Sequence, residues 1–314
     1  MNAAQEPFQG RRYDSPVSQE MAPSGNPKMT DSIESARRAY AEELWFTTHM
    51  RSQALRAAFA AVPRERFVGP GPWIFKTNWE NFAGWTTADD DPRQVYHDVL
   101  IALDEKLGLN NGLPAFWAFL LDRINVASGE SVTHLGCGTG YYTAILAELV
   151  GPTGKIRAID IHPDIAARAR EALAPWPQVQ VEHADGSKIA LEPADLIVVN
   201  AGATHPMPAW LAAVKPGGRI LIPITVTNGP GSMVLLTRRS DEEFGVRVLS
   251  NVFIYEFSGA RDPEVNERLR QAMTNSRGHE VKSVRTDSHA EDETCWLHGD
   301  GWCLSRRDPE RATR

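Results

Sequence analysis

Three glycines at alternate positions constrain this chain more than any other feature. The stretch VTHLGCGTGYYTAIL (132–146) begins with the apolar residues of a strand and ends with apolar residues at helical spacing. Gly136, Gly138 and Gly140 lie between the two. Because glycine has no Cβ, the backbone can turn tightly there and its N–H groups can approach a ligand closely. The stretch therefore predicts a strand, a ligand-binding loop and a helix.

The glycine spacing differs from that of a dinucleotide-binding loop, which follows G-x-G-x-x-G, whereas this loop follows G-x-G-x-G. Asp160 ends the next predicted strand, where a carboxylate can accept hydrogen bonds from both ribose hydroxyls. Asp185 and Gly186 end the third strand, where a side-chain acceptor could meet an adenine amino group. Each feature alone also suits an ordinary turn or helix cap. Their order predicts a ligand with an amino-acid tail and a nucleoside.

Strand and helix patterns alternate around this loop. Strands are expected at 131–135, 155–161, 179–184, 195–201, 219–225, 232–238 and 246–257. Helices are expected at 113–126, 140–150, 163–172 and 208–214. This alternation predicts a mostly parallel α/β sheet of seven strands with right-handed crossovers. The last two strands have no helix between them, so we expect an antiparallel hairpin at the sheet edge.

The N-terminal third has a different composition. Residues 32–61 carry apolar residues at helical spacing and are expected to form two helices. Residues 73–96 are rich in aromatic side chains, including Trp79 and Phe82, but intervening Asn, Gly and Asp argue against a long regular element. Residues 1–31 are rich in Pro, Ser, Gln, Gly and Asn, and we expect them to be disordered.

The bulk properties exclude several classes of protein. The net charge of −7 argues against a protein that binds nucleic acid by neutralising phosphates. No stretch approaches the roughly 18 consecutive apolar residues of a membrane helix, and the N-terminus has no apolar secretory segment. The three cysteines do not form an even disulfide framework. We therefore expect a cytoplasmic protein that has neither nucleic acid nor a membrane as a partner.

Three stretches carry a resemblance to a known family. They are AAFAAVPRERFVGP, which ends at Pro70, SVTHLGCGTGYYTAILAELVG (131–151) and DLIVVNAGATHPMPAWLAAVKPGGRILIPI (195–224). The chain resembles class I S-adenosylmethionine-dependent methyltransferases and, more narrowly, the protein-L-isoaspartate O-methyltransferase family, over roughly residues 35–258. The resemblance implies a Rossmann-like methyltransferase fold, S-adenosyl-L-methionine as cofactor and a peptide, protein or small-molecule acceptor.

One segment departs from the family pattern. Family members carry a G-Q-T-I-S-x-P-like segment whose hydroxyl residues sit at the methyl-transfer site. Tyr96 and Asp98 match the motif that precedes it, but the segment itself reads EKLGLNNGLPAF, with Asn110 and Asn111 where Thr and Ser are expected. Their amides can hold acceptor oxygens or the amino-acid tail of the cofactor by hydrogen bonds, or can simply form a turn before a helix. This departure makes isoaspartate repair the alternative hypothesis rather than the first.

The expected site combines the loop residues with those at strand ends. The cofactor-binding set is Gly136, Cys137, Gly138, Thr139, Gly140, Tyr142, Asp160, Ile161, Asp185, Gly186 and Asn200. Thr204 and His205 follow the fourth strand at the same edge and are candidates to face the acceptor, with Asn110 and Asn111. His205 is the candidate general base for a hydroxyl or amine acceptor, or else an exposed residue before Pro206.

The last sixty residues lie outside the resemblance. Residues 261–273 predict an exposed helix, and ETCWLHGDGWCLSR (293–306) predicts a hairpin whose turn contains Asp-Gly. Cys295, His298 and Cys303 resemble zinc ligands, but three ligands do not complete a four-ligand site. We therefore expect no metal, and two core cysteines beside tryptophans.

These patterns divide the chain into four regions. They are a disordered tail (1–31), an N-terminal helical and acceptor-side region (32–126), the S-adenosylmethionine-binding core (127–258) and a C-terminal helix and hairpin extension (259–314). The first functional hypothesis is an O-methyltransferase that methylates a carboxylate on a peptide, protein or small metabolite. The alternatives are true isoaspartate repair and a non-catalytic module that binds the cofactor or a partner.

Overall fold

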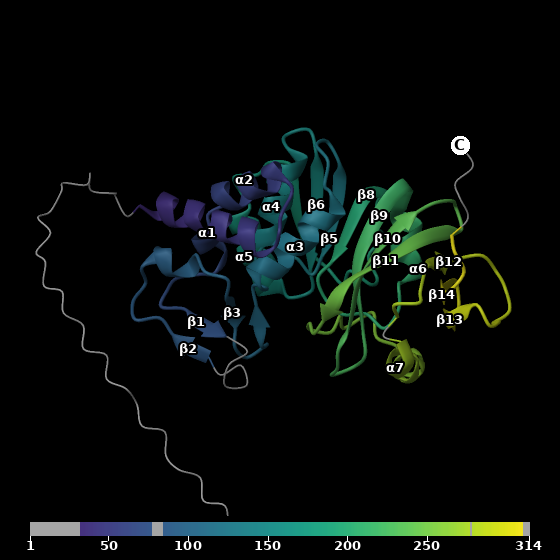
Figure 1. Cartoon of the computed structure of the whole chain (residues 1–314). Coiled ribbons are helices and arrows are strands. Elements are labelled where there is room, and N and C mark those ends of the chain that lie inside the picture. Colours follow the sequence, from purple (N-terminus) through teal and green to yellow (C-terminus); the bar gives the residue numbers. More distant parts are fainter. Residues whose placement is uncertain (1–31, 77–83, 277, 310–314) are drawn as a thin grey trace, which may run out of the picture. The chain divides into compact units, whose positions relative to one another are not determined.

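A ten-stranded mixed sheet runs through the computed structural model, which describes residues 32–76, 84–276 and 278–309 (Figure 1). Its strand order is β13-β14-β12-β11-β10-β9-β8-β5-β6-β7. The predicted tail 1–31, Trp79 and Phe82 lie outside the described residues.

The half of the sheet that carries the glycine loop is parallel. It contains β5 (Ser131–Leu135), β6 (Lys155–Asp160), β7 (Val179–His183), β8 (Ala194–Val199) and β9 (Val214–Thr225). Neighbouring strands pair in parallel from β7 through β6, β5 and β8 to β9. Carboxyl ends of these strands therefore meet at one edge, as the alternating pattern predicted.

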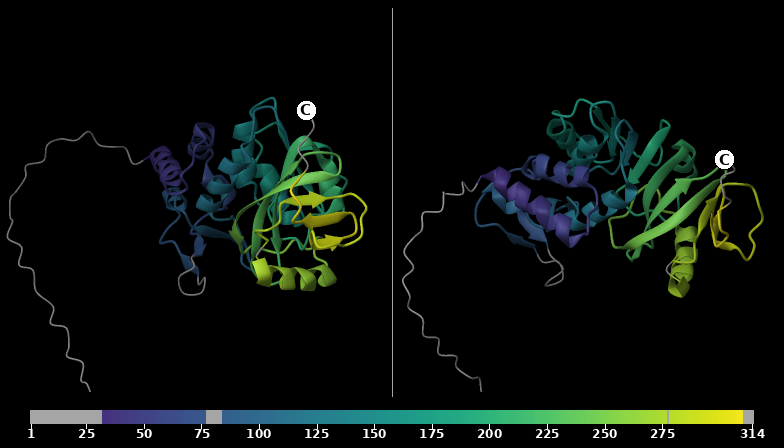
Figure 2. Two further views of the ribbon diagram at one scale, coloured as in Figure 1. Left: turned by 45° about the vertical axis from the view of Figure 1, so that its right-hand side comes forward. Right: turned by 45° about the horizontal axis from the view of Figure 1, so that its top comes forward.

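The other half of the sheet is antiparallel and has more strands than predicted. It contains β10 (Gly231–Arg238), β11 (Glu243–Val252), β12 (Ser283–Arg285), β13 (Cys295–Gly299) and β14 (Trp302–Ser305). The predicted antiparallel hairpin of β10 and β11 is confirmed, but the sheet has ten strands rather than seven, and β12, β14 and β13 continue it beyond β11, so the hairpin is not at the edge. β12 pairs with the start of β11, since a free strand edge presents unpaired N–H and C=O groups that another strand can satisfy. Figure 2 shows these C-terminal strands (yellow) beside the green ones.

The helices begin where the sequence supplies capping residues. α1 (Ile33–Thr47) and α2 (Gln53–Ala61) start at Ser32 and Ser52, whose hydroxyls accept N–H hydrogen bonds from the first turn. α3 (Pro114–Ile124), α5 (Pro163–Ala172) and α6 (Pro208–Ala213) start with proline, which needs no N–H partner there. α4 (Tyr141–Val150) follows the glycine loop, and α7 (Pro263–Ser276) precedes the C-terminal strands. The predicted helices are confirmed to within a few residues at their ends.

A second, small sheet precedes α3. It has the order β2-β1-β3-β4 and consists of β1 (Ile74–Lys76), β2 (Gly84–Thr86), β3 (Leu100–Asp104) and β4 (Leu109–Asn110). Among the described residues of 73–96, β1 and β2 have three residues each, which agrees with the expectation of no long element in that part. The sequence patterns did not predict β3 and β4, which deliver Asn110 to the carboxyl edge of the main sheet.

Apolar side chains cover both faces of the main sheet. Along β8, Leu196 and Val198 belong to one hydrophobic cluster, and Ile197 and Val199 to a second. Successive side chains on a strand point to opposite faces, so the sheet separates the two clusters. Trp296 and Trp302 of the extension belong to the second cluster, so the extension shares the core of the methyltransferase-like region. None of the described helices has both the length and the apolar character needed to cross a membrane.

Candidate active site

The glycine loop has backbone conformations that residues other than glycine rarely adopt. Gly136, Gly138 and Gly140 have φ angles of +72°, +57° and +97°. A Cβ on Gly140 would lie 2.6 Å from Cδ1 of Leu173, just beyond α5, so this glycine allows close packing of the loop. Gly136 and Gly138 instead line a cavity. Gly136 and Gly138 therefore face the cavity, whereas Gly140 allows the loop to pack closely.

Asp160 connects the loop to the end of β6. Its carboxylate accepts one hydrogen bond from the Gly138 N–H, at 2.9 Å, and another from the His162 N–H, at 3.0 Å. Burial raises the pKa of Asp160 above its ordinary value, although both N–H groups act in the opposite direction. A carboxylate can accept further hydrogen bonds, so its remaining lone pairs are available to a ribose.

A cavity of about 390 Å³ lies at the carboxyl ends of β5, β6 and β8. Six of the residues predicted to bind the cofactor line it: Gly136, Gly138, Asp160, Ile161, Gly186 and Asn200. Asn110 lines it as well, together with the segment 251–258 at the end of β11. The cavity therefore joins the predicted cofactor residues to one of the two asparagines.

The two asparagines point in different directions. Asn110 Nδ2 donates a 2.9 Å hydrogen bond to the Tyr255 hydroxyl, and its Oδ1 accepts one from the Gly112 N–H. Asn111 is buried, and its Oδ1 accepts hydrogen bonds from Ile101 N and from the Arg64 guanidinium. Asn111 therefore holds the loop, whereas Asn110 faces the cavity.

The comparison with known families decides the classification. The family model described as protein-L-isoaspartate(D-aspartate) O-methyltransferase matches residues 86–258, which contain the glycine loop, Asp160 and Asn110. The chain belongs to this family. It is therefore an S-adenosylmethionine-dependent methyltransferase, as the resemblance implied.

Curated relatives carry the same family name. A protein-L-isoaspartate O-methyltransferase of Ignicoccus hospitalis is 30% identical over 207 residues, which cover 65% of this chain and 87% of the relative. One of Methanothermobacter thermautotrophicus is 26% identical over 220 residues, which cover 69% and 92%.

Solved structures show the same fold at lower identity. A protein-L-isoaspartate O-methyltransferase matches with a TM-score of 0.58 and 19% identity, covering 74% of this chain and 69% of its own. A putative one from Plasmodium falciparum, solved in complex with S-adenosyl-L-homocysteine, matches with a TM-score of 0.56 and 16% identity, covering 71% and 98%. The Rossmann-like methyltransferase fold is therefore confirmed.

Several of the residues predicted to bind the cofactor have side chains that lie outside the cavity. Thr139 Oγ1 donates to the Phe67 carbonyl at 2.5 Å, and the Tyr142 hydroxyl donates to the Gly112 carbonyl at 3.1 Å. Cys137 is buried. None of these side chains lines the cavity, and Thr139 and Tyr142 attach the loop and α4 to the N-terminal region.

The carboxylate of Asp185 has its hydrogen-bond and ion-pair partners within its own turn. Its Oδ1 accepts hydrogen bonds from the N–H and hydroxyl of Ser187, and its Oδ2 lies 3.0 Å from Lys188 Nζ. Burial raises the pKa of Asp185, but these partners outweigh it and leave the pKa below the ordinary value. Ala184 and Gly186 line the cavity on either side of it, so the predicted adenine contact of Asp185 stays a prediction.

The structure does not bring Thr204 and His205 to the cavity. Thr204 Oγ1 lies 3.0 Å from Nδ1 of His205 and accepts a hydrogen bond from the Asp262 N–H. The His205 ring stacks on Trp302, with ring centroids 4.9 Å apart. Burial lowers the pKa of His205. The C-terminal hairpin therefore covers the side chain that the sequence made the candidate base.

Two parts of the site were not predicted. Arg64 is fully buried and donates to the carbonyls of Val95, His97 and Val99, so it organises the segment before β3. Arg64 lies in the V-P-R-E-x-F-V stretch that carries part of the family resemblance, but the spacing of that stretch did not reveal the carbonyls to which Arg64 donates. The strand predicted to reach 257 ends at Val252, because the chain then leaves the sheet and Tyr255 O accepts a hydrogen bond from Gly202 N. Residues 253–258 thereby become a wall of the cavity.

Proposed function

We propose that this chain transfers a methyl group from S-adenosylmethionine to a carboxylate oxygen of a peptide or protein. The observation that carries the proposal is the single cavity that joins Gly136, Gly138 and Asp160 to the Asn110–Tyr255 pair. The first group suits the cofactor, and the pair lies where an acceptor can enter.

The residues present fit the cofactor. The cavity volume of about 390 Å³ lies within the range of sites that hold small molecules. Asp160 would accept hydrogen bonds from the ribose, and the loop backbone at Gly136 and Gly138 would approach the amino-acid tail. Ile161 and Ile165 provide apolar walls on which a nucleobase can pack.

The chemistry requires positioning rather than proton transfer. When bound, S-adenosylmethionine supplies an electrophilic methyl group. A carboxylate is ionised at neutral pH, so it needs no general base and its methyl ester forms without transfer of a proton. The side chains therefore have to orient the acceptor and exclude water. Asn110 Nδ2 has a second N–H in place to donate to a carboxylate oxygen, and the Tyr255 hydroxyl, which accepts from the same amide, orients it.

The cavity mouth favours a peptide over a small metabolite. Phe253 lines the cavity although 76% of its surface is exposed, and Tyr255 and Leu113 are also exposed there. Exposed apolar side chains around a cavity are typical of surfaces that a protein partner covers. These side chains would contact the residues that flank the methylated carboxylate.

Isoaspartate repair is the second candidate function. The names of the curated relatives favour it, whereas Asn110 at the place of a hydroxyl residue favours a different carboxylate. An assay with methyl-labelled S-adenosylmethionine distinguishes the two. It compares an isoaspartyl peptide with the same peptide that contains a normal aspartate, and with a mixture of cellular peptides.

We expect a base-labile methyl product, which identifies a carboxyl ester. Transfer only to the isoaspartyl peptide would establish repair, and transfer to the other peptides would establish the first proposal. A base-stable methyl group would contradict both. Tight cofactor binding without transfer to any acceptor would identify a non-catalytic module instead.

A further inference from the structure

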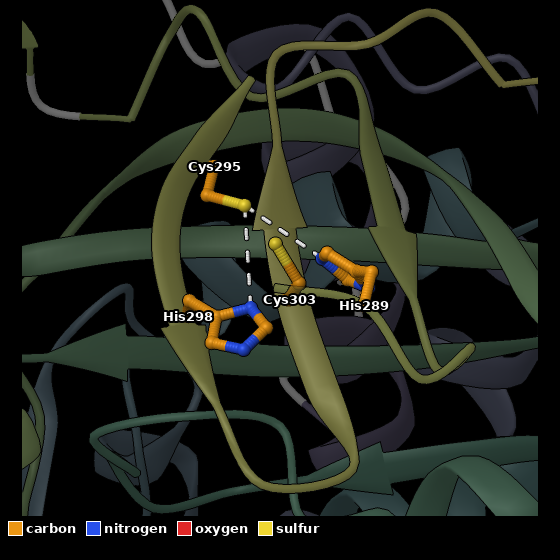
Figure 3. Close-up of side chains that lie close together, drawn as sticks. All are labelled: His289, Cys295, His298 and Cys303. Atoms are coloured by element: carbon orange, nitrogen blue, oxygen red, sulfur yellow. Dashed lines mark hydrogen bonds between the residues drawn. The ribbon is translucent and has the colours of Figure 1, made fainter. Parts of the chain in front are cut away.

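Four metal-binding side chains converge in the C-terminal extension, outside the residues that match the family. We propose that His289, Cys295, His298 and Cys303 bind a structural zinc ion. Figure 3 shows the four side chains pointing toward one another. The ligand atoms that they offer all lie within 4.8 Å of one another. The sequence pattern contained three of these ligands, and the structure adds His289 as the fourth.

The distances are close to those of a tetrahedral zinc site. Cys295 Sγ lies 3.7 Å from His289 Nε2 and 4.0 Å from His298 Nδ1. Zinc–sulfur bonds of ~2.3 Å and zinc–nitrogen bonds of ~2.0–2.1 Å place tetrahedral ligand atoms roughly 3.3–3.8 Å apart. Side-chain shifts of roughly 1 Å or less therefore bring the four atoms to bonding positions around one ion.

Local backbone structure explains why these residues meet. His298 and Cys303 are paired directly across β13 and β14, and Cys295 lies beside an irregularity in the register of β13. Trp302 and Leu304, the neighbours of Cys303, pack in the second hydrophobic cluster. Because side chains alternate along a strand, Cys303 points to the opposite face, where His289 approaches from the preceding segment.

The two cysteines among the four ligands are buried, and the two histidines are partly buried. Cys303 is fully buried, Cys295 is 8% exposed, and the side chain of His289 is 12% exposed. A buried group of two thiols and two imidazoles contributes little apolar packing. Binding a metal gives such a group a structural role in three short strands.

A neighbouring residue orients one ligand. Nδ1 of His289 lies 2.9 Å from the backbone carbonyl of Asp287, which can only accept, so Nδ1 carries the proton and donates. Nε2 is then left with its lone pair toward Cys295, as zinc coordination requires. The Asp287 carboxylate lies 3.3 Å from the same Nδ1 and accepts a hydrogen bond from Arg285. A carboxylate or carbonyl behind a histidine ligand is the usual support of a zinc site.

The ligand set also identifies the metal and its role. Thiolates and imidazoles favour zinc over magnesium or calcium, which prefer oxygen ligands. On binding, each cysteine thiol releases one proton to solvent, and two thiolates then balance the charge of the ion. Four protein ligands leave no open position for substrate, so the ion stabilises the hairpin and takes no part in methyl transfer.

The test measures the metal content of the full chain, purified under reducing conditions. We expect about one equivalent of zinc per chain by elemental mass spectrometry. After the zinc is removed with a chelator, titration with Co²⁺ should produce the absorption bands of tetrahedral cobalt and of thiolate-to-metal charge transfer. Asp287→Asn removes the carboxylate behind His289 but keeps the backbone carbonyl that accepts from Nδ1, so it should weaken binding by at most roughly 10-fold, the lower end of the usual effect of losing such a support.

Ligand variants separate coordination from folding. Cys303→Ser and His298→Gln should lose the metal, whereas His298→Cys should retain it, because a Cys₃His set also binds zinc. Cys137→Ser and the exposed His279→Gln serve as matched controls, scored for metal content alone, and should both keep the metal. A wild-type chain that holds neither zinc nor Co²⁺ would overturn the proposal. So would a reduced protein that binds no Co²⁺ and forms a Cys295–Cys303 disulfide on oxidation.

Discussion

Asn110 and Tyr255 lie 145 residues apart in the sequence, and the Asn110 amide donates a 2.9 Å hydrogen bond to the Tyr255 hydroxyl at the cavity. Tyr255 in turn donates to the carbonyl of Gly108 in the turn before β4. This pair links the segment that departs from the family pattern to the segment that leaves the sheet after β11. The proposed acceptor side of the site therefore depends on a contact between two parts of the chain that no local motif connects.

Substitution of Asn110 should affect methyl transfer more than cofactor binding. Asn110→Ala and Tyr255→Phe each remove a polar group at the acceptor side, and we expect kcat/KM for the acceptor to fall roughly 10- to 100-fold. The Kd of the cofactor should change by less than about threefold. Steady-state kinetics and calorimetry measure the two quantities. The double variant should lose less than the product of the two single effects, since the residues interact.

Asn111→Ala is the control for the adjacent position. It leaves the N–H of Ile101 and one donor of Arg64 without their acceptor, so the free energy of unfolding should fall by roughly 1–3 kcal/mol. A loss of activity in Asn111→Ala without a loss of stability would contradict the different roles that we assign to the two residues.

Asp160→Asn should weaken cofactor binding. The carboxylate is replaced by an amide with a single acceptor oxygen, so we expect Kd to rise roughly 10- to 100-fold. The exposed residue Asp164, in the first turn of α5, provides Asp164→Asn as a control with the same change of charge, whose Kd should not change. Because burial raises the pKa of Asp160, binding should weaken on acidification at a higher pH than for an ordinary aspartate. An unchanged Kd in Asp160→Asn would show that the ribose lies elsewhere.

Gly140→Ala should destabilise the fold through a steric clash. The added Cβ lies 2.6 Å from Leu173 Cδ1, and the φ angle of +97° is unfavourable for alanine. Gly217→Ala is the matched control, because Gly217 has a φ of +73° but no atom within 4 Å of the added Cβ. We expect Gly217→Ala to cost roughly 1–2 kcal/mol and Gly140→Ala roughly 1–3 kcal/mol more, measured by denaturant unfolding. Equal costs would show that the packing against Leu173 adjusts freely.

His134 should make the protein sensitive to acid. It is buried in β5, and burial lowers its pKa from 6.5 to about 4. Between those values the unfolded chain binds a proton that the folded chain does not, so stability falls as the pH falls, by about 3 kcal/mol over the window. The raised pKa of Asp160 has the opposite effect on stability, and this effect should be the same in the wild type and in a His134 variant.

His134→Gln should lose this component of the pH dependence. The free energy of unfolding of both proteins, measured from about pH 7 to about pH 4, tests it. Parallel curves for wild type and variant would show that His134 does not determine the acid response.

Local sequence patterns predicted much of the fold and the cofactor side of the site. The glycine loop, its flanking strand and helix, and Asp160 at the end of β6 follow from apolar periodicity and from backbone conformations that only glycine adopts readily. The same patterns missed β3, and they missed β4 because two residues are too few to show a period. They also extended the last predicted strand through residue 257, although the chain turns away after Val252 to pair with Gly202.

By itself, the sequence determined the parallel α/β core, the family and the cofactor, since each of those signals is carried by residues within a short stretch of the chain. Only the tertiary structure decided which of two adjacent asparagines faces the cavity, because side-chain direction depends on how the backbone is held by distant partners such as Arg64. It also covered His205 with Trp302 and brought His289 to Cys295, His298 and Cys303. These contacts join separate segments, and their geometry arises from packing and strand register rather than from spacing along the chain.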